Sequence, residues 1–221
     1  MLDFSLVNVL GACLIITSMT VVLARTGAGA AKLYALQSAV LVSLLAVLGT
    51  VTGSTELYMW SVSAFITKVV LVPCILLFVL KKIAATAPGV AVDLPPKLAP
   101  MKCVALVAVE VFACFVVVSG IDLPTAAAVK PTLAVAFAHF FIGLTCIVIQ
   151  RSVVKQIFGY CLMENGSHVT LALLAPQAPE LVEIGIATDA IFAVVILSVM
   201  VLTLARKAHT LDADDLCELK G

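Results

Sequence analysis

The chain has 221 residues, of which 63% are hydrophobic and only 12% are charged, and its formal net charge is zero. A soluble domain is typically about 45–50% apolar and about 25% charged, so this composition favours an all-α integral membrane protein. The balanced charge excludes the basic footprint of a nucleic-acid-binding protein. The seven cysteines form no C-x-x-C pair, so we expect no metal site and no haem or iron–sulfur cofactor.

Seven apolar segments are each long enough to cross a bilayer core of about 30 Å, which takes about 20 helical residues. Short breaks that contain glycine, proline or charged residues separate them. The seven predicted transmembrane helices cover residues 4–24, 33–52, 57–80, 101–120, 131–150, 154–175 and 180–205.

The charges in the connecting segments alternate from one side of the predicted bundle to the other. The segments after spans one, three, five and seven carry Arg25, Lys32, Lys81, Lys82, Lys97, Lys102, Arg151, Lys155, Arg206, Lys207 and Lys220. The opposite side carries Glu56, Asp122, Glu180 and Glu183, with Lys130 as its one base. Because basic loops stay in the cytoplasm, we expect the N-terminus outside and the C-terminus in the cytoplasm.

The first three and the last three spans share an outline, which predicts two three-helix repeats joined by helix four. In each triplet the first span ends at an arginine, and the third begins near a glutamate and ends at paired bases. Both triplets would cross in the same direction, a pattern known in transporters. The predicted units are a first repeat over 1–82, a Pro-rich cytoplasmic loop with a connecting helix over 83–130, a second repeat over 131–207, and a cytoplasmic tail over 208–221.

Five of the spans each carry a titratable residue near mid-depth: Lys68, Glu110, His139, Glu164 and Asp189. At about 1.5 Å per residue, each lies roughly 12–18 Å from its end of the helix, so five helices place such a group at one level. Burial moves the pKa values of carboxylates and amines toward neutrality, where imidazole already titrates. Because ionisable groups at this depth are costly and usually functional, the row predicts a lateral proton or ion path.

The segment Gly159–His168 is the most polar part of any span and adds three side chains to this row, those of Asn165, Ser167 and His168. Glu164 and His168 are four residues apart and share a helix face. Asn165 and Ser167 are expected to order water beside them, while Gly159 and Gly166 permit a close approach of a second helix.

Static roles stay open for several members of the row. Lys68 and Asp189 could form a buried ion pair between helices, and Glu110 could pair with Lys68. His139 could be a satisfied core histidine.

Three other polar groups are expected to lie outside the path. Gln37 is expected to make a hydrogen bond between helices rather than to act in a relay. Glu180 and Glu183 are expected to be solvated charges at a helix end.

Three stretches resemble hydrogenase-4 component E, a family of integral membrane subunits: Ser63–Pro73, Gly159–His168 and Ala178–Ala193. The resemblance covers nearly the whole chain. It implies a subunit of a membrane-bound nickel–iron hydrogenase of the formate hydrogenlyase type, a complex similar to respiratory complex I, in the bacterial inner (plasma) membrane. The last three spans resemble the K subunit of bacterial complex I (chain 4L) and the C subunit of multisubunit Na⁺/H⁺ antiporters.

The resemblance also implies roles and partners. Two membrane glutamates carry the coupling path in the complex I subunit, and the resemblance places the second at Asp189. The first falls on Cys161, so Glu164 would act one turn later, a shift of about 4–5 Å along the helix. The chain would hold no redox cofactor. It would contact antiporter-like membrane subunits and a complex I-like membrane anchor that carries the peripheral hydrogenase arm, and hydrogen evolution would drive ion movement.

Two further functions stay open. The chain could belong to a multisubunit cation/proton antiporter that has no redox partner. It could also be a structural membrane scaffold whose static buried ion pairs fix the register of its helices. The sequence does not distinguish H⁺ from Na⁺.

Overall fold

The structure is a computed structural model that describes residues 4–122 and 127–218, and these residues are mostly helical. The long helices are α1 (Phe4–Val22), α2 (Gly27–Thr52), α3 (Thr55–Ala64), α4 (Val72–Thr86), α5 (Pro100–Ser119), α6 (Lys130–Ile149), α7 (Val153–Leu174) and α8 (Glu180–Lys207). Three short elements complete the described fold: the π-helix η1 (Phe65–Leu71), the 3-10 helix η2 (Ala127–Val129) and α9 (Ala213–Glu218). The prediction of an all-α protein is confirmed for the described residues.

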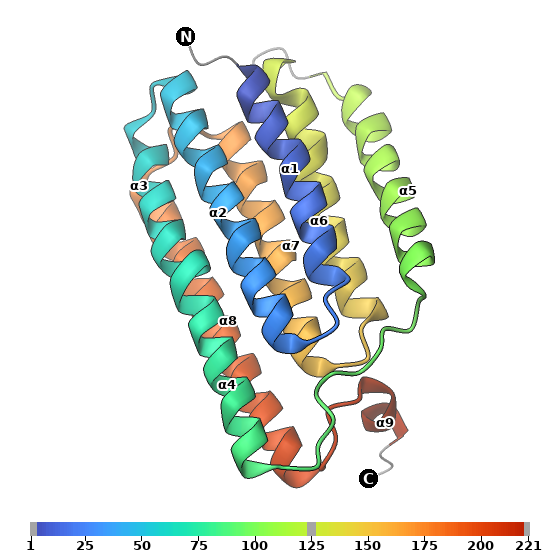
Figure 1. Cartoon of the computed structure of the whole chain (residues 1–221). Coiled ribbons are helices and arrows are strands. Elements are labelled where there is room, and N and C mark those ends of the chain that lie inside the picture. The colour runs from blue at the N-terminus through green and yellow to red at the C-terminus, as the bar shows by residue number, and fades with distance from the viewer. Residues whose placement is uncertain (1–3, 123–126, 219–221) are drawn as a thin grey trace.

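The long helices form two layers of three, with α5 at one edge (Figure 1). The first layer holds α1, α2 and the continuous α3–η1–α4 helix, and the second holds α6, α7 and α8. Each helix packs on its counterpart, α1 on α6, α2 on α7 and α4 on α8, and corresponding helices run in the same direction. One end of the bundle, termed the acidic end, carries Glu56, Glu180 and Glu183; the other, termed the basic end, carries Arg25, Lys81, Arg151 and Arg206.

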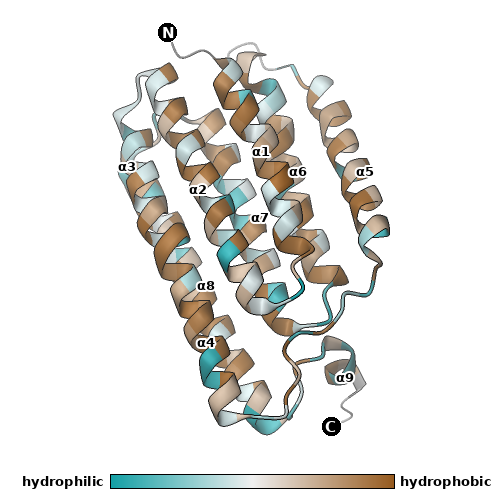
Figure 2. Ribbon diagram, viewed as in Figure 1, coloured by the Kyte–Doolittle hydropathy of each residue, from teal (hydrophilic) through white to brown (hydrophobic). Residues whose placement is uncertain are grey.

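Six helical segments of the described chain are long and apolar enough to cross a membrane: Phe4–Val22, Gly27–Thr52, Thr55–Thr86, Pro100–Ser119, Ala127–Ile149 and Glu180–Lys207. Helix α7 is the predicted span that is not among them, although it runs the length of the bundle beside α6 (Figure 1). Its polar residues lower its hydropathy, and Figure 2 shows them in the middle of a bundle whose outer helices are mostly hydrophobic. The surface of α7 is instead covered by α6, α2 and α8.

Helix α2 begins at Gly27, well before the start predicted at residue 33. The Thr26 side chain accepts a hydrogen bond from the backbone nitrogen of Gly29, which is a normal N-cap. The Asp93 carboxylate accepts a second one, 2.7 Å from the Gly27 nitrogen. Hydropathy missed this turn because its small residues are not strongly apolar, whereas capping decides where the helix starts.

A π-helix interrupts the third crossing and determines where Lys68 lies. Pro73 has no N–H and cannot continue the normal ladder of hydrogen bonds. The Val72 N–H bonds the Thr67 carbonyl, five residues back. The wider turn buries Thr67 and Lys68, while Phe65 is 49% exposed. Because this segment is π-helical, regular α-helical periodicity does not give the direction of its side chains. Such turns occur often at functional sites.

Helices α6 and α7 approach so closely that their contact requires glycine. A β-carbon added to Gly143 would lie 2.3 Å from the Met163 backbone nitrogen, and one added to Gly159 would lie 2.9 Å from the Gly143 carbonyl oxygen. Such distances are far inside van der Waals contact. The expected close approach at Gly159 is therefore confirmed, and α6 contributes a glycine to the same contact.

The basic end is closed by the Pro-rich loop and by the described part of the tail, which fold back on the α6–α7 corner. The Ser152 hydroxyl donates to the Val92 carbonyl at 2.7 Å, and the Lys97 N–H donates to the Ile149 carbonyl at 2.8 Å. Arg151 forms a two-point ion pair with Asp212. The tail is thus docked on its own chain up to Glu218, and its last residues lie outside the described ones.

Substituting Gly143→Ala is expected to destabilise the bundle, because no side-chain movement relieves a contact with backbone. Overpacking of this kind costs about 1–3 kcal/mol. Thermal unfolding of the purified protein in detergent should show a lower Tm. Gly185→Ala on α8 is the matched control, since nothing lies within 4 Å of its β-carbon position. Equal Tm values for the two variants would contradict the close α6–α7 contact.

Docking of the tail is expected to weaken at acid pH. Hydrogen bonding to Arg151 lowers the pKa of the Asp212 carboxyl below its usual value. Because the pKa of Asp212 is lowered in the docked tail, its stabilising contribution is complete above the pKa of the free carboxyl, about 3.9. The contribution is lost as the pH falls through the lower pKa of the docked state. Hydrogen exchange of residues 208–218 should therefore speed up in that window. Asp212→Asn should exchange fast already at neutral pH, and Asp215→Asn, which removes an exposed carboxylate, should not.

Candidate functional site at the centre of the bundle

A layer of polar side chains crosses the bundle at mid-height, between two apolar cores. One core includes Leu14, Leu41, Ala64, Ala136 and Val169, and the other includes Val21, Tyr34, Val72, Ile142 and Leu162. On each of these five helices a polar residue with 0% exposure lies between a member of one core and a member of the other: Ser18, Gln37, Lys68, His139 and Asn165, and on α2 Ser38, also 0% exposed, lies beside Gln37. Buried polar groups are stable only when they are paired, so their contacts determine what this layer can do.

Lys68 pairs across the two layers with two neighbours on α7. Its ammonium forms an ion pair with Glu164, and it donates a second hydrogen bond to the side-chain oxygen Oδ1 of Asn165 at 2.9 Å. The Glu164 side chain is 11% exposed, and its other oxygen has no hydrogen-bond partner among the described residues. The alternative partners considered from sequence, Asp189 and Glu110, are therefore wrong for Lys68.

Hydrogen bonds continue from Asn165 to the far side of the bundle. The side-chain nitrogen Nδ2 of Asn165 donates to the side-chain oxygen Oε1 of Gln37 at 2.9 Å. The Gln37 amide nitrogen lies 3.3 Å from His139 Nε2, and His139 Nδ1 lies 2.7 Å from the Ser18 hydroxyl. This network connects η1, α7, α2, α6 and α1.

The donors in the network all point away from Lys68. Because the Gln37 oxygen accepts from Asn165, its nitrogen is the donor toward His139, whose Nε2 must accept. The proton of the neutral ring then lies on Nδ1 and is donated to Ser18. His139 is thus a satisfied, buried histidine within the network.

Amide side chains do not titrate, so Asn165 and Gln37 fix orientations here rather than carry protons. Lys68 and Glu164 are the ionisable pair in direct contact. The prediction that Gln37 bonds between helices is confirmed, but its position at the centre of the network was missed. In the predicted span 33–52 Gln37 lies only four residues from the helix start, so its depth becomes apparent only because α2 begins at Gly27.

A second polar cluster lies between Glu164 and the acidic end. His168 is 1% exposed and Glu183 is 3% exposed, and His168 Nε2 lies 2.8 Å from Glu183 Oε2. The two atoms are not aligned for a hydrogen bond, so both groups retain unused hydrogen-bonding capacity. The prediction that Glu183 is a solvated end charge is wrong, because α8 turns this residue of its first helical turn toward α7.

The remaining residues predicted on this side line a cavity between α7 and α8. It has a volume of about 270 Å³, and its lining includes Tyr160, Glu164, Ser167, His168 and Asp189. Ser167 is exposed and donates to the Met163 carbonyl at 3.3 Å. Asp189 is exposed on the same helix as apolar residues such as Phe192, which is 63% exposed.

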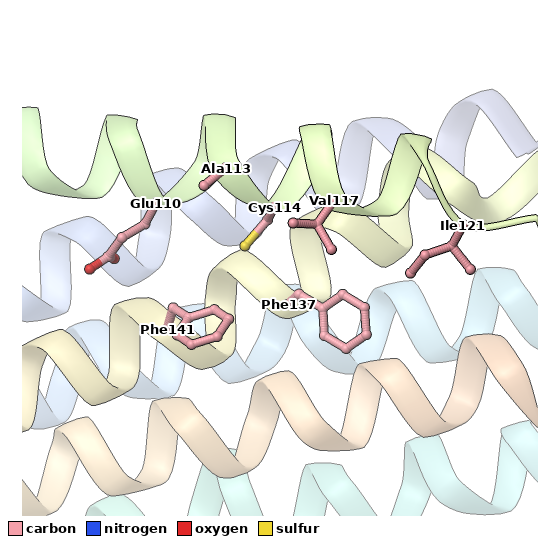
Figure 3. A pocket seen from close by; sticks show the side chains of 7 residues that line it. All are labelled: Glu110, Ala113, Cys114, Val117, Ile121, Phe137 and Phe141. Atoms are coloured by element: carbon pink, nitrogen blue, oxygen red, sulfur yellow. The ribbon is translucent and has the colours of Figure 1, made fainter.

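Glu110 lies apart from the network, on α5. One of its oxygens accepts from Thr145 on α6, and the other is buried without a partner among the described residues. Figure 3 shows it at one side of an apolar cavity of about 530 Å³ between α5 and α6, with Cys114, Phe137 and Phe141 in the lining. Glu110 bonds Thr145, whereas Lys68 bonds Glu164 and Asn165, so the network joins three of the five predicted midplane groups: Lys68, His139 and Glu164.

No group of three or more potential metal ligands from His, Cys, Asp and Glu is found among residues 4–122 and 127–218.

Comparison with known proteins identifies the family of this chain. Hydrogenase-4 component E from Escherichia coli is 47% identical over 216 residues, which cover 98% of this chain and 98% of that protein, and the Shigella flexneri protein of the same name matches equally well. The chain belongs to the hydrogenase-4 component E family. The resemblance found in the sequence is thereby confirmed.

Two further matches cover parts of the chain. Residues 131–221 match the family model of NADH-ubiquinone/plastoquinone oxidoreductase chain 4L, a range that contains α7 and α8. An uncharacterized protein of Mycobacterium tuberculosis is 34% identical over 85 residues, 38% of this chain and 39% of that protein. No solved structure matches the chain.

A double-mutant cycle is expected to show strong coupling between Lys68 and Glu164. Lys68→Met leaves Glu164 without its cation, and loss of one partner of a buried pair costs about 3–5 kcal/mol. The double variant Lys68→Met/Glu164→Gln removes both charges and should recover most of the loss. Tm values of the purified protein in detergent give the comparison. A double variant as unstable as the sum of the single ones would mean that the two residues do not interact.

Proposed function

We propose that this protein is an integral membrane subunit of a complex I-like, membrane-bound nickel–iron hydrogenase of the formate hydrogenlyase type, and that its polar layer contributes a proton or ion path coupled to hydrogen evolution. The observation that carries the proposal is the buried Lys68–Glu164 pair at the centre of a hydrogenase-4 component E chain. The chain 4L match over α6–α8 supports the likeness to complex I.

The Lys68–Glu164 pair has the chemistry that an exchangeable site needs. A charged group at the centre of a bilayer costs about 2.5–3.5 kcal/mol even on the lenient insertion scale. Mutual contact offsets that cost, so a proton that neutralises one partner destabilises the charge on the other. Glu164 also reaches the α7–α8 cavity, which gives the pair a route to Asp189 and His168. His139 would sense the state of Lys68 through Asn165 and Gln37, and Ser167 would hold water in the cavity.

The proposed topology has seven crossings, with the N-terminus outside and the basic end in the cytoplasm of a bacterium. Its support is the alternation of helix direction in Figure 1, with α7 as a crossing shielded from lipid, and the excess of bases at one end. The layers α1–α2–α3/4 and α6–α7–α8 would then be parallel repeats with α5 as their joint.

Asp189 supports a role as a subunit rather than as a solitary protein. An exposed carboxylate in an apolar helix is unstable against lipid. The outer face of α8 also exposes Ile196 at 65% and Val199 at 58%. We propose that an antiporter-like membrane subunit covers this face, and that the complex I-like membrane anchor links the assembly to the peripheral hydrogenase arm. Glu110, at the cavity of α5, would serve a second contact of the same kind.

The function is tested with inverted membrane vesicles that contain the assembled complex. Glu164→Gln keeps the shape of the side chain but cannot exchange a proton, so the ion gradient formed per hydrogen evolved should be lost in complexes that native gels show to be assembled. Glu180→Gln is the matched control, since Glu180 is an exposed charge in the first turn of α8. Ion gradient and hydrogen production are followed together.

The outcome separates three functions. Retained coupling in Glu164→Gln would identify a structural scaffold, for which the fully bonded amides of the polar layer would suffice. Purification with antiporter subunits but without a nickel–iron subunit would identify an antiporter assembly. Varying Na⁺ in the same vesicles identifies the ion.

A further inference from the structure

Three buried side chains near the acidic end have polar atoms that no described residue bonds. They are Trp60 Nε1, both ring nitrogens of His168 and both carboxylate oxygens of Glu183. The Trp60 and His168 rings are in contact, with their centroids 5.5 Å apart. Buried polar groups are normally paired, and a group that is not indicates a bound water, an ion or a catalytic role. Several such groups side by side indicate a site.

His168 connects this cluster to the cavity of Glu164. Its Nε2 lies 2.8 Å from Glu183, and its side chain also lines the α7–α8 cavity together with Glu164 and Asp189. Glu164 lies one helical turn from His168 on the same face of α7. A volume of about 270 Å³ holds several waters, since one water takes about 30 Å³ in the liquid.

Glu183 lies close to the aqueous phase of the acidic end. It is in the first turn of α8, which begins at Glu180. The neighbouring loop is held there by the Ser54 hydroxyl, which donates to the Pro176 carbonyl. Glu183 is buried against His168, whose imidazole can accept a proton from the Glu183 carboxyl.

We infer that the Glu183–His168 pair is the port through which protons pass between the acidic end and Glu164, with water in the α7–α8 cavity as the link. Glu183 is not one of the five titratable residues predicted at mid-depth. The inference rests on the proposed function, because it supplies the access route to the same path. It also gives the site a ligand class, a short chain of hydrogen-bonded waters.

The transfer balances at each step. A proton held by the Glu183 carboxyl moves to His168 Nε2, which forms the imidazolium. The imidazolium releases its Nδ1 proton to a cavity water, which passes a proton to the Glu164 carboxylate. The Glu183 carboxylate takes a new proton from the aqueous phase at the acidic end, and the ring, now protonated at Nε2, resets by rotating so that Nε2–H faces the cavity water and Nδ1 faces Glu183. The charged or titratable groups facing this route, besides His168 and Glu183 themselves, are Tyr160 and Glu164 from α7 and Asp189 from α8.

The test uses inverted vesicles with the assembled complex and three variants of α8. Glu183→Gln keeps the shape but cannot carry a proton, so the gradient formed per hydrogen evolved should fall by about ten-fold or more. Glu183→Asp retains a carboxyl and should recover much of the coupling, which a purely structural role would not predict. Glu180→Gln should match the wild type. Native gels establish that each complex is assembled. If Glu183→Gln fails to assemble, His168→Asn, which is close in size to the native residue, is measured in its place and should show the same loss of coupling.

Two outcomes overturn the inference. If Glu164→Gln loses coupling while Glu183→Gln and His168→Asn retain it, the path exists but protons reach it elsewhere. If Glu183→Asp is as impaired as Glu183→Gln in an assembled complex, Glu183 is a packing residue. Retained coupling in Glu164→Gln is the separate result that removes the proposed function itself.

Discussion

The structure depends on one constraint: the polar groups inside the bundle have to satisfy one another, because neither lipid nor the apolar cores can do so. Lys68 is the centre of this requirement, with a charge that needs both Glu164 and Asn165. Asn165 in turn needs Gln37, and the remaining bonds follow to Ser18. A shift of any one helix along its axis would leave several buried groups unpaired, so the layer fixes the register of five helices at once.

Two backbone features bring these groups together. The π-helix at Phe65–Leu71 turns Lys68 inward, and Pro73 interrupts the regular hydrogen bonds of the same helix. Glycine contacts let α6 and α7 approach closely, which places His139 and Asn165 on opposite sides of Gln37. At the basic end, the ion pair of Arg151 with Asp212 holds the tail against the α6–α7 corner.

Depth along each span could be predicted from the sequence, but pairing could not. Counting residues from a charged helix end placed Lys68, His139 and Glu164 at one level, and the structure joins all three. Which group faces which depends on helix rotation, and the π-helix changes that rotation in a way that hydropathy does not indicate. Glu183 was misjudged for the same reason: nearness to a helix end suggested solvent, whereas the turn of α8 buries it against His168. Helix α7 can carry polar residues, which lower its hydropathy, because other helices of the bundle cover it.

The glycine contact has a consequence for how the pair can work. Without β-carbons between them, α6 and α7 pack backbone to backbone, so Glu164 stands on a closely packed pair of helices. Lys68 is attached to the opposite layer by a π-helical turn, the one irregular stretch among the described transmembrane helices. A change in the distance between the ammonium and the carboxylate is therefore expected to involve rewinding of that turn rather than movement of α7 against α6.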